Sequence, residues 1–214
     1  MKLRFIKKLG SSRAKNKYDF LDLGCKVGNS IGWAHRKYGG RGLGVDFKPE
    51  MIKQARKNGY DAIVGDALKL EFPPNSFRYI SMMHFLEHLP NEKAVKQILQ
   101  NCKKWARDFS FIHHPSFEDI EYLKKLGFKI DWTDWSGHTA MLTIKDFKRI
   151  FKELGLNDYK IEQEMLIEDS LHEHIVPLNA PIDTLRYEKK LGPKKKVKFD
   201  KPMYGRLEIF VNLK

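Results

Sequence analysis

The stretch FLDLGCKVGNS, Phe20 to Ser30, decides how the rest of this 214-residue chain is interpreted. Its first four residues are apolar except for Asp22, as in a buried strand, and two glycines follow four residues apart. Gly24 suits a tight turn, and Gly28 lets the following helix approach the strand closely. Lys26 stands between them, where a further glycine is expected. The stretch therefore predicts a strand, a ligand-binding loop and a helix.

Strands and helices are expected to alternate on the C-terminal side of this stretch. The predicted strands are 18–23, 42–46, 60–67, 77–83, 108–114, 159–167 and 206–212. The predicted helices are 29–39, 49–59, 91–106 and 143–155, the last with Thr143 and Asp146 as a capped start. Such alternation predicts an α/β fold with a doubly wound, mostly parallel seven-stranded sheet.

Two segments interrupt the alternation, residues 116–142 after the fifth strand and residues 170–204 after the sixth. The first is rich in aromatic residues, and the second is basic and contains the run GPKKKVK. We expect a single domain, 1–214, with these segments as insertions over the sheet edge, because the length suits one substantial core.

Composition limits the cellular context and the partners. Two cysteines, Cys25 and Cys102, are too few for a disulfide framework and favour a reducing cytoplasm. No apolar run predicts a signal peptide or a membrane span. The net charge of +13 favours encounters with anionic partners, so RNA or another polyanion remains a candidate partner of the basic surface.

Acidic residues close three consecutive predicted strands. Asp22 is followed by Asp46 and Asp66, each at the end where an open parallel sheet binds its ligand. The carboxylate of Asp46 is suited to accept hydrogen bonds from both hydroxyls of a ribose. Asp residues also form ordinary turns after strands, but three in succession with intervening glycines favour a binding site.

These motifs, in this order, resemble the class I S-adenosylmethionine-dependent methyltransferases. The resemblance rests on DLGCKVG, GVDFKPEM, GDA and FRYISMMHFLEHL, and covers about 18–167 and 205–214. It implies an antiparallel last strand and S-adenosyl-L-methionine as cofactor. The residues that it implies around the cofactor are Asp22, Gly24, Cys25 and Gly28 at the methionine end, Asp46 at the ribose, Phe47, Asp66 and Ala67 at the adenine, and Met83 near the sulfonium.

Lys26 departs from the glycine usual at its position in this family. A positive φ there costs a lysine on the order of 1 kcal/mol. Its ammonium is expected either near the carboxylate of the cofactor or in solvent. A degenerate cofactor-binding protein without activity therefore remains an alternative.

Five of the eight histidines follow the fourth and fifth strands or lie in the next insertion: His84, His88, His113, His114 and His138. We expect them to share one rim of the sheet, with His84 and His138 as candidate bases that take a proton from the acceptor. His84, Glu87 and His88 also spell H-x-x-E-H. The related metal-assisting E-x-x-E-H of some ubiquinone-pathway O-methyltransferases has Glu where this chain has His84, so no metal is predicted.

The methyl acceptor is expected to be an unidentified small molecule, methylated on O or N. Trp132, Trp135 and Phe117 lie where this family builds a substrate lid, although they are equally suited to roof the core. Motifs typical of enzymes that methylate DNA bases are missing after the fourth strand. A methyltransferase acting on RNA or protein is the alternative.

Overall fold

The computed structural model describes residues 17–214, apart from the side chain of Lys190. The expectation about a signal peptide concerns the N-terminus, which lies outside the described residues except for Lys17. The strands are β1 (Phe20–Leu23), β2 (Gly42–Asp46), β3 (Ala62–Val64), β4 (Phe77–Met83), β5 (Ala106–Pro115), β6 (Phe128–Ile130), β7 (Tyr159–Asp169), β8 (Ile175–Pro177) and β9 (Lys198–Asn212). The α-helices are α1 (Asn29–Tyr38), α2 (Pro49–Lys57), α3 (Glu92–Trp105), α4 (Ile120–Lys125) and α5 (Ile144–Glu153).

Seven strands form the main sheet in the order β3-β2-β1-β4-β5-β9-β7. β1 pairs in parallel with both β2 and β4, whereas β9 is antiparallel to its neighbours β5 and β7. The predicted α/β sheet with an antiparallel last strand is confirmed. Because β1 lies centrally, the loop that follows it opens at the edge where the strand order reverses.

Helices cover both faces of the sheet. Apolar side chains of α1 and α2 pack with Phe20 and Tyr79 on one face, and those of α3 and α5 pack with Leu21 and Ile80 on the other. The alternation of side chains along β1 and β4 thus supplies both cores. Thr143 and Asp146 form the predicted capping box of α5.

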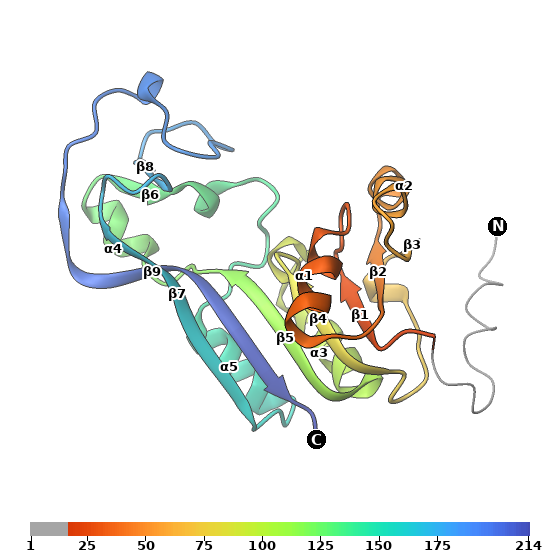
Figure 1. Cartoon of the computed structure of the whole chain (residues 1–214). Coiled ribbons are helices and arrows are strands. Elements are labelled where there is room, and N and C mark those ends of the chain that lie inside the picture. The colour runs from red at the N-terminus through yellow and green to blue at the C-terminus, as the bar shows by residue number, and fades with distance from the viewer. Residues whose placement is uncertain (1–16) are drawn as a thin grey trace.

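The two interrupting segments meet in a small second sheet. β6 lies in the first segment and β8 in the second, and they pair antiparallel with Ile130 opposite Ile175. A third apolar cluster, which includes Leu123, Ile167 and Met203, fixes this sheet against α4 and the ends of β7 and β9. Figure 1 shows β7 and β9 extending past the main sheet to reach α4, β6 and β8.

Candidate functional site

The loop after β1 has a backbone that glycine suits. Gly24 and Gly28 have φ values of 74° and 97°, in the left-handed region that favours glycine. A Cβ on Gly24 would lie 2.6 Å from Phe85 Cδ2, and one on Gly28 would lie 2.2 Å from Tyr60 Cδ2. The loop is therefore packed so closely that side chains at these two positions would disturb it.

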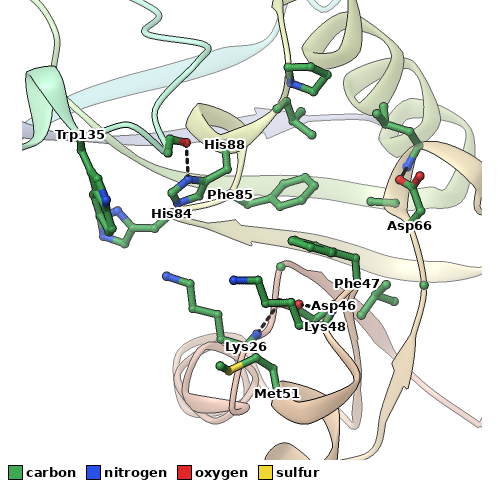
Figure 2. A pocket seen from close by; sticks show the side chains of 18 of the residues that line it. Lys26, Asp46, Phe47, Lys48, Met51, Asp66, His84, Phe85, His88 and Trp135 are labelled. Atoms are coloured by element: carbon green, nitrogen blue, oxygen red, sulfur yellow. Dashed lines mark hydrogen bonds between the residues drawn. The ribbon is translucent and has the colours of Figure 1, made fainter. Parts of the chain in front are cut away.

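Lys26 also has a left-handed backbone, with a φ of 46°. Its N–H donates to Asp46 Oδ2 at 3.0 Å, which connects the glycine loop to the end of β2. The side chain is exposed and extends along the cavity toward His84 and Trp135 (Figure 2). The lysine thus takes the backbone conformation of a glycine while its ammonium stays in solvent.

A cavity of about 690 Å³ lies at the ends of β1, β2, β3 and β4. Of the residues expected around the cofactor, its walls include Gly24, Asp46, Phe47, Asp66 and Ala67. Figure 2 shows Asp46, Phe47 and Asp66 together with Met51 and Phe85, two wall residues that sequence reasoning missed. Both lie inside quoted motifs, Met51 in GVDFKPEM and Phe85 in FRYISMMHFLEHL, but their residue types are also those of ordinary core positions.

Asp46 and Phe47 give this cavity a polar and an apolar side. Asp46 is buried, and its Oδ1 accepts a hydrogen bond of 2.9 Å from the N–H of Lys48. Since Lys26 donates to Oδ2, each oxygen keeps one further acceptor position. The ring of Phe47 is 69% exposed, with the ammonium of Lys48 5.6 Å from its centroid, so most of its flat apolar surface stays open. Asp46 and Phe47 together suit a ligand that combines hydroxyl groups with a flat ring.

Other expected cofactor residues lie elsewhere around the loop. Cys25 and Met83 line an adjacent cavity of about 400 Å³, together with Gly24 and Lys26. Gly28 lies where α1 packs against Tyr60. Burial raises the pKa of the Cys25 thiol, so this residue is a neutral wall residue rather than a nucleophile.

Asp22 lies fully buried behind the glycine loop. Its two oxygens accept hydrogen bonds of 2.5 Å from the hydroxyls of Ser30 in α1 and Ser81 in β4. Burial raises the pKa of Asp22 to about 6, although the two hydroxyls act in the opposite direction. Asp22 therefore connects the first turn of α1 to the neighbouring strand.

A second cavity, of about 450 Å³, lies beside the first, between the main sheet and the two interrupting segments. The two cavities share Lys26, His84, His88 and Trp135. The other walls of the second cavity include Glu87, Asp131, Trp132, His138, Met165, His174, Arg186 and Arg206. The two cavities therefore adjoin one another at these four side chains.

The five histidines lie close together but in different environments. The rings of His84 and His113 are 4.6 Å apart, and those of His88 and His138 are 5.0 Å apart. Burial lowers the pKa of His113 to about 3 and also lowers the pKa values of His114 and His138. His113 and His114 are buried in β5, whereas the other three line the second cavity.

The aromatic residues of the first interrupting segment divide between cavity and core. Trp132 and Trp135 line the second cavity, and the indole N–H of Trp132 donates to the carbonyl of Ser116 at 3.0 Å. Phe117 is 3% exposed and packs edge-on against His114 and His138. Phe117 thus supports the histidines from the core side.

Asp131 and His174 form a contact that sequence reasoning missed. His174 Nδ1 lies 2.8 Å from Asp131 Oδ2, and the two residues flank the pairing of β6 with β8. His174 and Asp131 are 43 residues apart in the sequence, and the pairing of β6 with β8 brings them together.

Comparisons with known proteins show which proteins this chain is similar to. Residues 20–108 match a family model described as "Methyltransferase domain". A norajmaline N-methyltransferase from Rauvolfia serpentina is 28% identical over 168 residues, which cover 69% of this chain and 55% of that protein. The chain spans between 33% and 55% of the length of three curated relatives that it matches.

Two solved structures show the same fold. A SAM-dependent methyltransferase from Archaeoglobus fulgidus has 21% identity and a TM-score of 0.64, over 92% of this chain and 87% of that chain. Haemonchus contortus phosphoethanolamine N-methyltransferase 2, solved with S-adenosyl-L-methionine, has 19% identity and a TM-score of 0.53, over 73% of this chain and 36% of that chain.

Within residues 17–214, no helix combines the length and the apolar character that crossing a membrane requires. The mostly parallel seven-stranded sheet, with its antiparallel β9, matches the fold of these solved structures. The chain is therefore similar to S-adenosylmethionine-dependent methyltransferases, in sequence over residues 20–108 and in fold over most of its length.

Proposed function

We propose that this protein is an S-adenosylmethionine-dependent methyltransferase that methylates an O or N atom of a small molecule. The observation that carries the proposal is the pair of adjoining cavities that share Lys26, His84, His88 and Trp135. Methyl transfer requires a donor and an acceptor held about 3 to 3.5 Å apart and in line, and adjoining cavities provide such a placement.

The residues around the first cavity fit the cofactor. Asp46 would accept from the ribose hydroxyls, since each of its oxygens keeps an acceptor position. Phe47 would stack on the adenine, with Ala67 beside it and Asp66 at the edge of the ring. Gly24 leaves room at the loop, where a Cβ would meet Phe85. Once bound, the sulfonium of the cofactor supplies an activated methyl group.

For the methionine end we keep Asp22, Cys25, Gly28 and Met83 as proposed residues. Cys25 and Met83 support this placement because they line the cavity next to Gly24. Asp22 and Gly28 would act through the loop, by fixing the start of α1.

His84 is the best candidate for the base that takes a proton from the acceptor. It is exposed, lines both cavities, and its Nδ1 lies 3.3 Å from the carboxylate of Glu87, which would orient the ring. His138 is the second candidate, since burial lowers its pKa and favours the neutral ring. His138 lines the second cavity but not the first, which places it on the acceptor side.

A small acceptor is favoured over RNA or protein by the size and the walls of the second cavity. Its volume of about 450 Å³ lies within the range typical of small-molecule sites. The interrupting segments supply Trp132, Trp135 and Arg186 to its walls, so they close over the cavity as a lid. A reducing, cytoplasmic location stays our prediction, because Cys25 and Cys102 are both unpaired and buried.

Profiling with methyl-labelled cofactor tests this function. The protein is incubated with a metabolite extract and, separately, with total RNA and with protein extract. Label is expected in the small-molecule fraction, and His84→Ala is expected to lower its rate by about 10²-fold with cofactor affinity unchanged. Label confined to RNA or protein would establish the alternative substrate class. Cofactor binding without transfer to any fraction would identify a non-catalytic member.

A further inference from the structure

Glu87 is a buried carboxylate without a hydrogen-bond donor. Its side chain is 0% exposed, and neither of its oxygens has a hydrogen-bond partner. The side chain of His84 lies beside it, with Nδ1 3.3 Å from Oε1. Removing a carboxylate from water without donors costs several kcal/mol unless a cation compensates it. A cation next to Glu87 would therefore stabilise this buried carboxylate.

Two histidines beside Glu87 are held by backbone carbonyls. His88 Nδ1 lies 2.8 Å from the carbonyl of Gly137, and His138 Nδ1 lies 2.8 Å from the carbonyl of Trp132. A carbonyl only accepts, so Nδ1 carries the hydrogen in both rings and Nε2 keeps its lone pair. Histidines that bind metals are typically oriented in this way, through the nitrogen that does not bind the metal.

The backbone holds the two segments that carry these side chains together. The N–H groups of Thr139 and Ala140 donate to the carbonyl of Glu87 at 2.9 and 3.1 Å, and Thr139 Oγ1 donates to the carbonyl of Leu89 at 2.5 Å. One potential ligand atom from each of Glu87, His88 and His138 lies within 4.8 Å of the other two. Ligands about 2.0 to 2.2 Å from one ion lie up to roughly 4 Å apart, so a small contraction completes the geometry.

We propose that Glu87, His88 and His138 bind a divalent transition metal, with Zn²⁺ as the preferred ion. Two imidazoles and a carboxylate suit Zn²⁺, whereas Mg²⁺ and Ca²⁺ prefer oxygen ligands alone. The H-x-x-E-H motif supplies only two of these three ligands, Glu87 and His88. Its first histidine, His84, faces Glu87 but is not part of the three-residue cluster. His138, fifty residues along the chain from His88, supplies the third ligand.

The proposed metal would also meet the acceptor. Glu87, His88 and His138 all line the second cavity, so a metal that they hold would be within reach of a molecule bound there. A hydroxyl bound to the metal would lose its proton more readily, and His84 would remain the base that takes it. This role rests on the proposed methyl transfer, but metal binding itself does not.

Metal binding is tested on the chelator-treated full chain, with its purification tag removed and without S-adenosylmethionine. Zn²⁺ titration calorimetry is expected to give one site per chain. His88→Ala and His138→Ala should each weaken this site by about 10²-fold or more, and Glu87→Gln by at least about tenfold. His35→Ala is the matched control, because His35 is an exposed histidine on α1 and should leave the affinity unchanged.

Circular dichroism and thermal unfolding of the metal-free variants show whether each of them folds. A folded His138→Ala variant that binds Zn²⁺ as tightly as the wild type would overturn the proposal. The absence of stoichiometric Zn²⁺ binding by the folded wild type would also overturn the proposal. It would indicate that a neighbouring side chain such as His84, and not a metal, compensates the charge of Glu87. Neither result bears on cofactor binding, so the proposed function is tested separately.

Discussion

Asp22 shows how burial sets the ionisation of a single residue in the glycine loop. The carboxyl lies between the hydroxyls of Ser30 and Ser81 with no exposed surface, and its pKa rises to about 6. In the unfolded chain its pKa returns to the ordinary value of 3.8. The folded protein therefore holds this proton more tightly than the unfolded chain does.

Asp22→Asn is expected to change the pH dependence of stability. The contribution of Asp22 to the free energy of unfolding is fully present below about pH 4 and is lost as the pH rises through about 6, because Asp22 ionises more easily in the unfolded chain. The free energy of unfolding of the Asn variant, relative to wild type, should rise by roughly 2 to 3 kcal/mol between about pH 4 and about pH 7. Urea unfolding measures this difference, and parallel pH profiles for the two proteins would contradict it.

At the scale of secondary structure, β6 and β8 decide whether the interrupting segments form one unit. Ile175 in β8 has no exposed surface and pairs with Ile130 in β6. Trp132 and His138 lie two and eight residues after the end of β6, so the pairing supports one side of the second cavity. The first cavity takes most of its walls from the ends of β1 to β4 instead.

Ile175→Ala should therefore separate stability from cofactor binding. The lost side chain leaves a cavity in the third apolar cluster, and we expect the free energy of unfolding to fall by about 2 to 5 kcal/mol. S-adenosylmethionine affinity should stay within about threefold of wild type at a temperature where the variant is folded. Leu178→Ala is the control, since Leu178 is 42% exposed and its truncation should change little. Equal losses of stability in both variants would contradict this account of the small sheet.

The sequence predicts the main sheet well because its signals are local. β4 has the predicted bounds 77–83, and the capping box places the start of α5 at Ile144 as expected. β9 begins at Lys198, eight residues before the predicted 206, because its pairing with β7 extends the strand through a segment interpreted as an insertion. β3 is shorter than predicted, at Ala62–Val64.

The second cavity is less predictable because it depends on contacts between distant segments. Residues at strand ends, such as Asp46, are expected at one edge of the sheet from the parallel order alone. Strands of three residues, such as β6 and β8, carry too little pattern to reveal their pairing, so the contact of Asp131 with His174 is invisible in the sequence. The single-domain organisation of residues 1–214 stays a prediction.

At the scale of the whole molecule, the net charge of +13 includes a lysine run that is partly built into the structure. Lys194 donates to the carbonyl of His172 at 2.6 Å, and burial lowers its pKa to about 8. Lys196 pairs with Asp169 at 3.4 Å, and both Lys195 and Lys198 are exposed. Exposed lysines of this kind act mainly on encounters with anionic partners.

Replacing Lys195, Lys196 and Lys198 by Gln tests that role. Small-molecule turnover is expected to stay near wild type, because none of the three lines either main cavity. Binding of a polyanion such as heparin should weaken and show a shallower dependence on salt, as fewer phosphate or sulfate contacts release counterions. A collapse of small-molecule turnover in the folded triple variant would contradict this separation of roles.

Calorimetric titration with S-adenosylmethionine tests the central claim most directly, that the first cavity holds this cofactor. Wild type is expected to bind in the micromolar range, and Asp46→Ala should weaken binding by about 1 to 3 kcal/mol through a lost charge-assisted hydrogen bond. Lys26→Gly should bind within about threefold of wild type, because it keeps the left-handed backbone and removes only an exposed ammonium. No binding by folded wild type at millimolar S-adenosylmethionine, or unchanged affinity in a folded Asp46→Ala variant, would contradict the account.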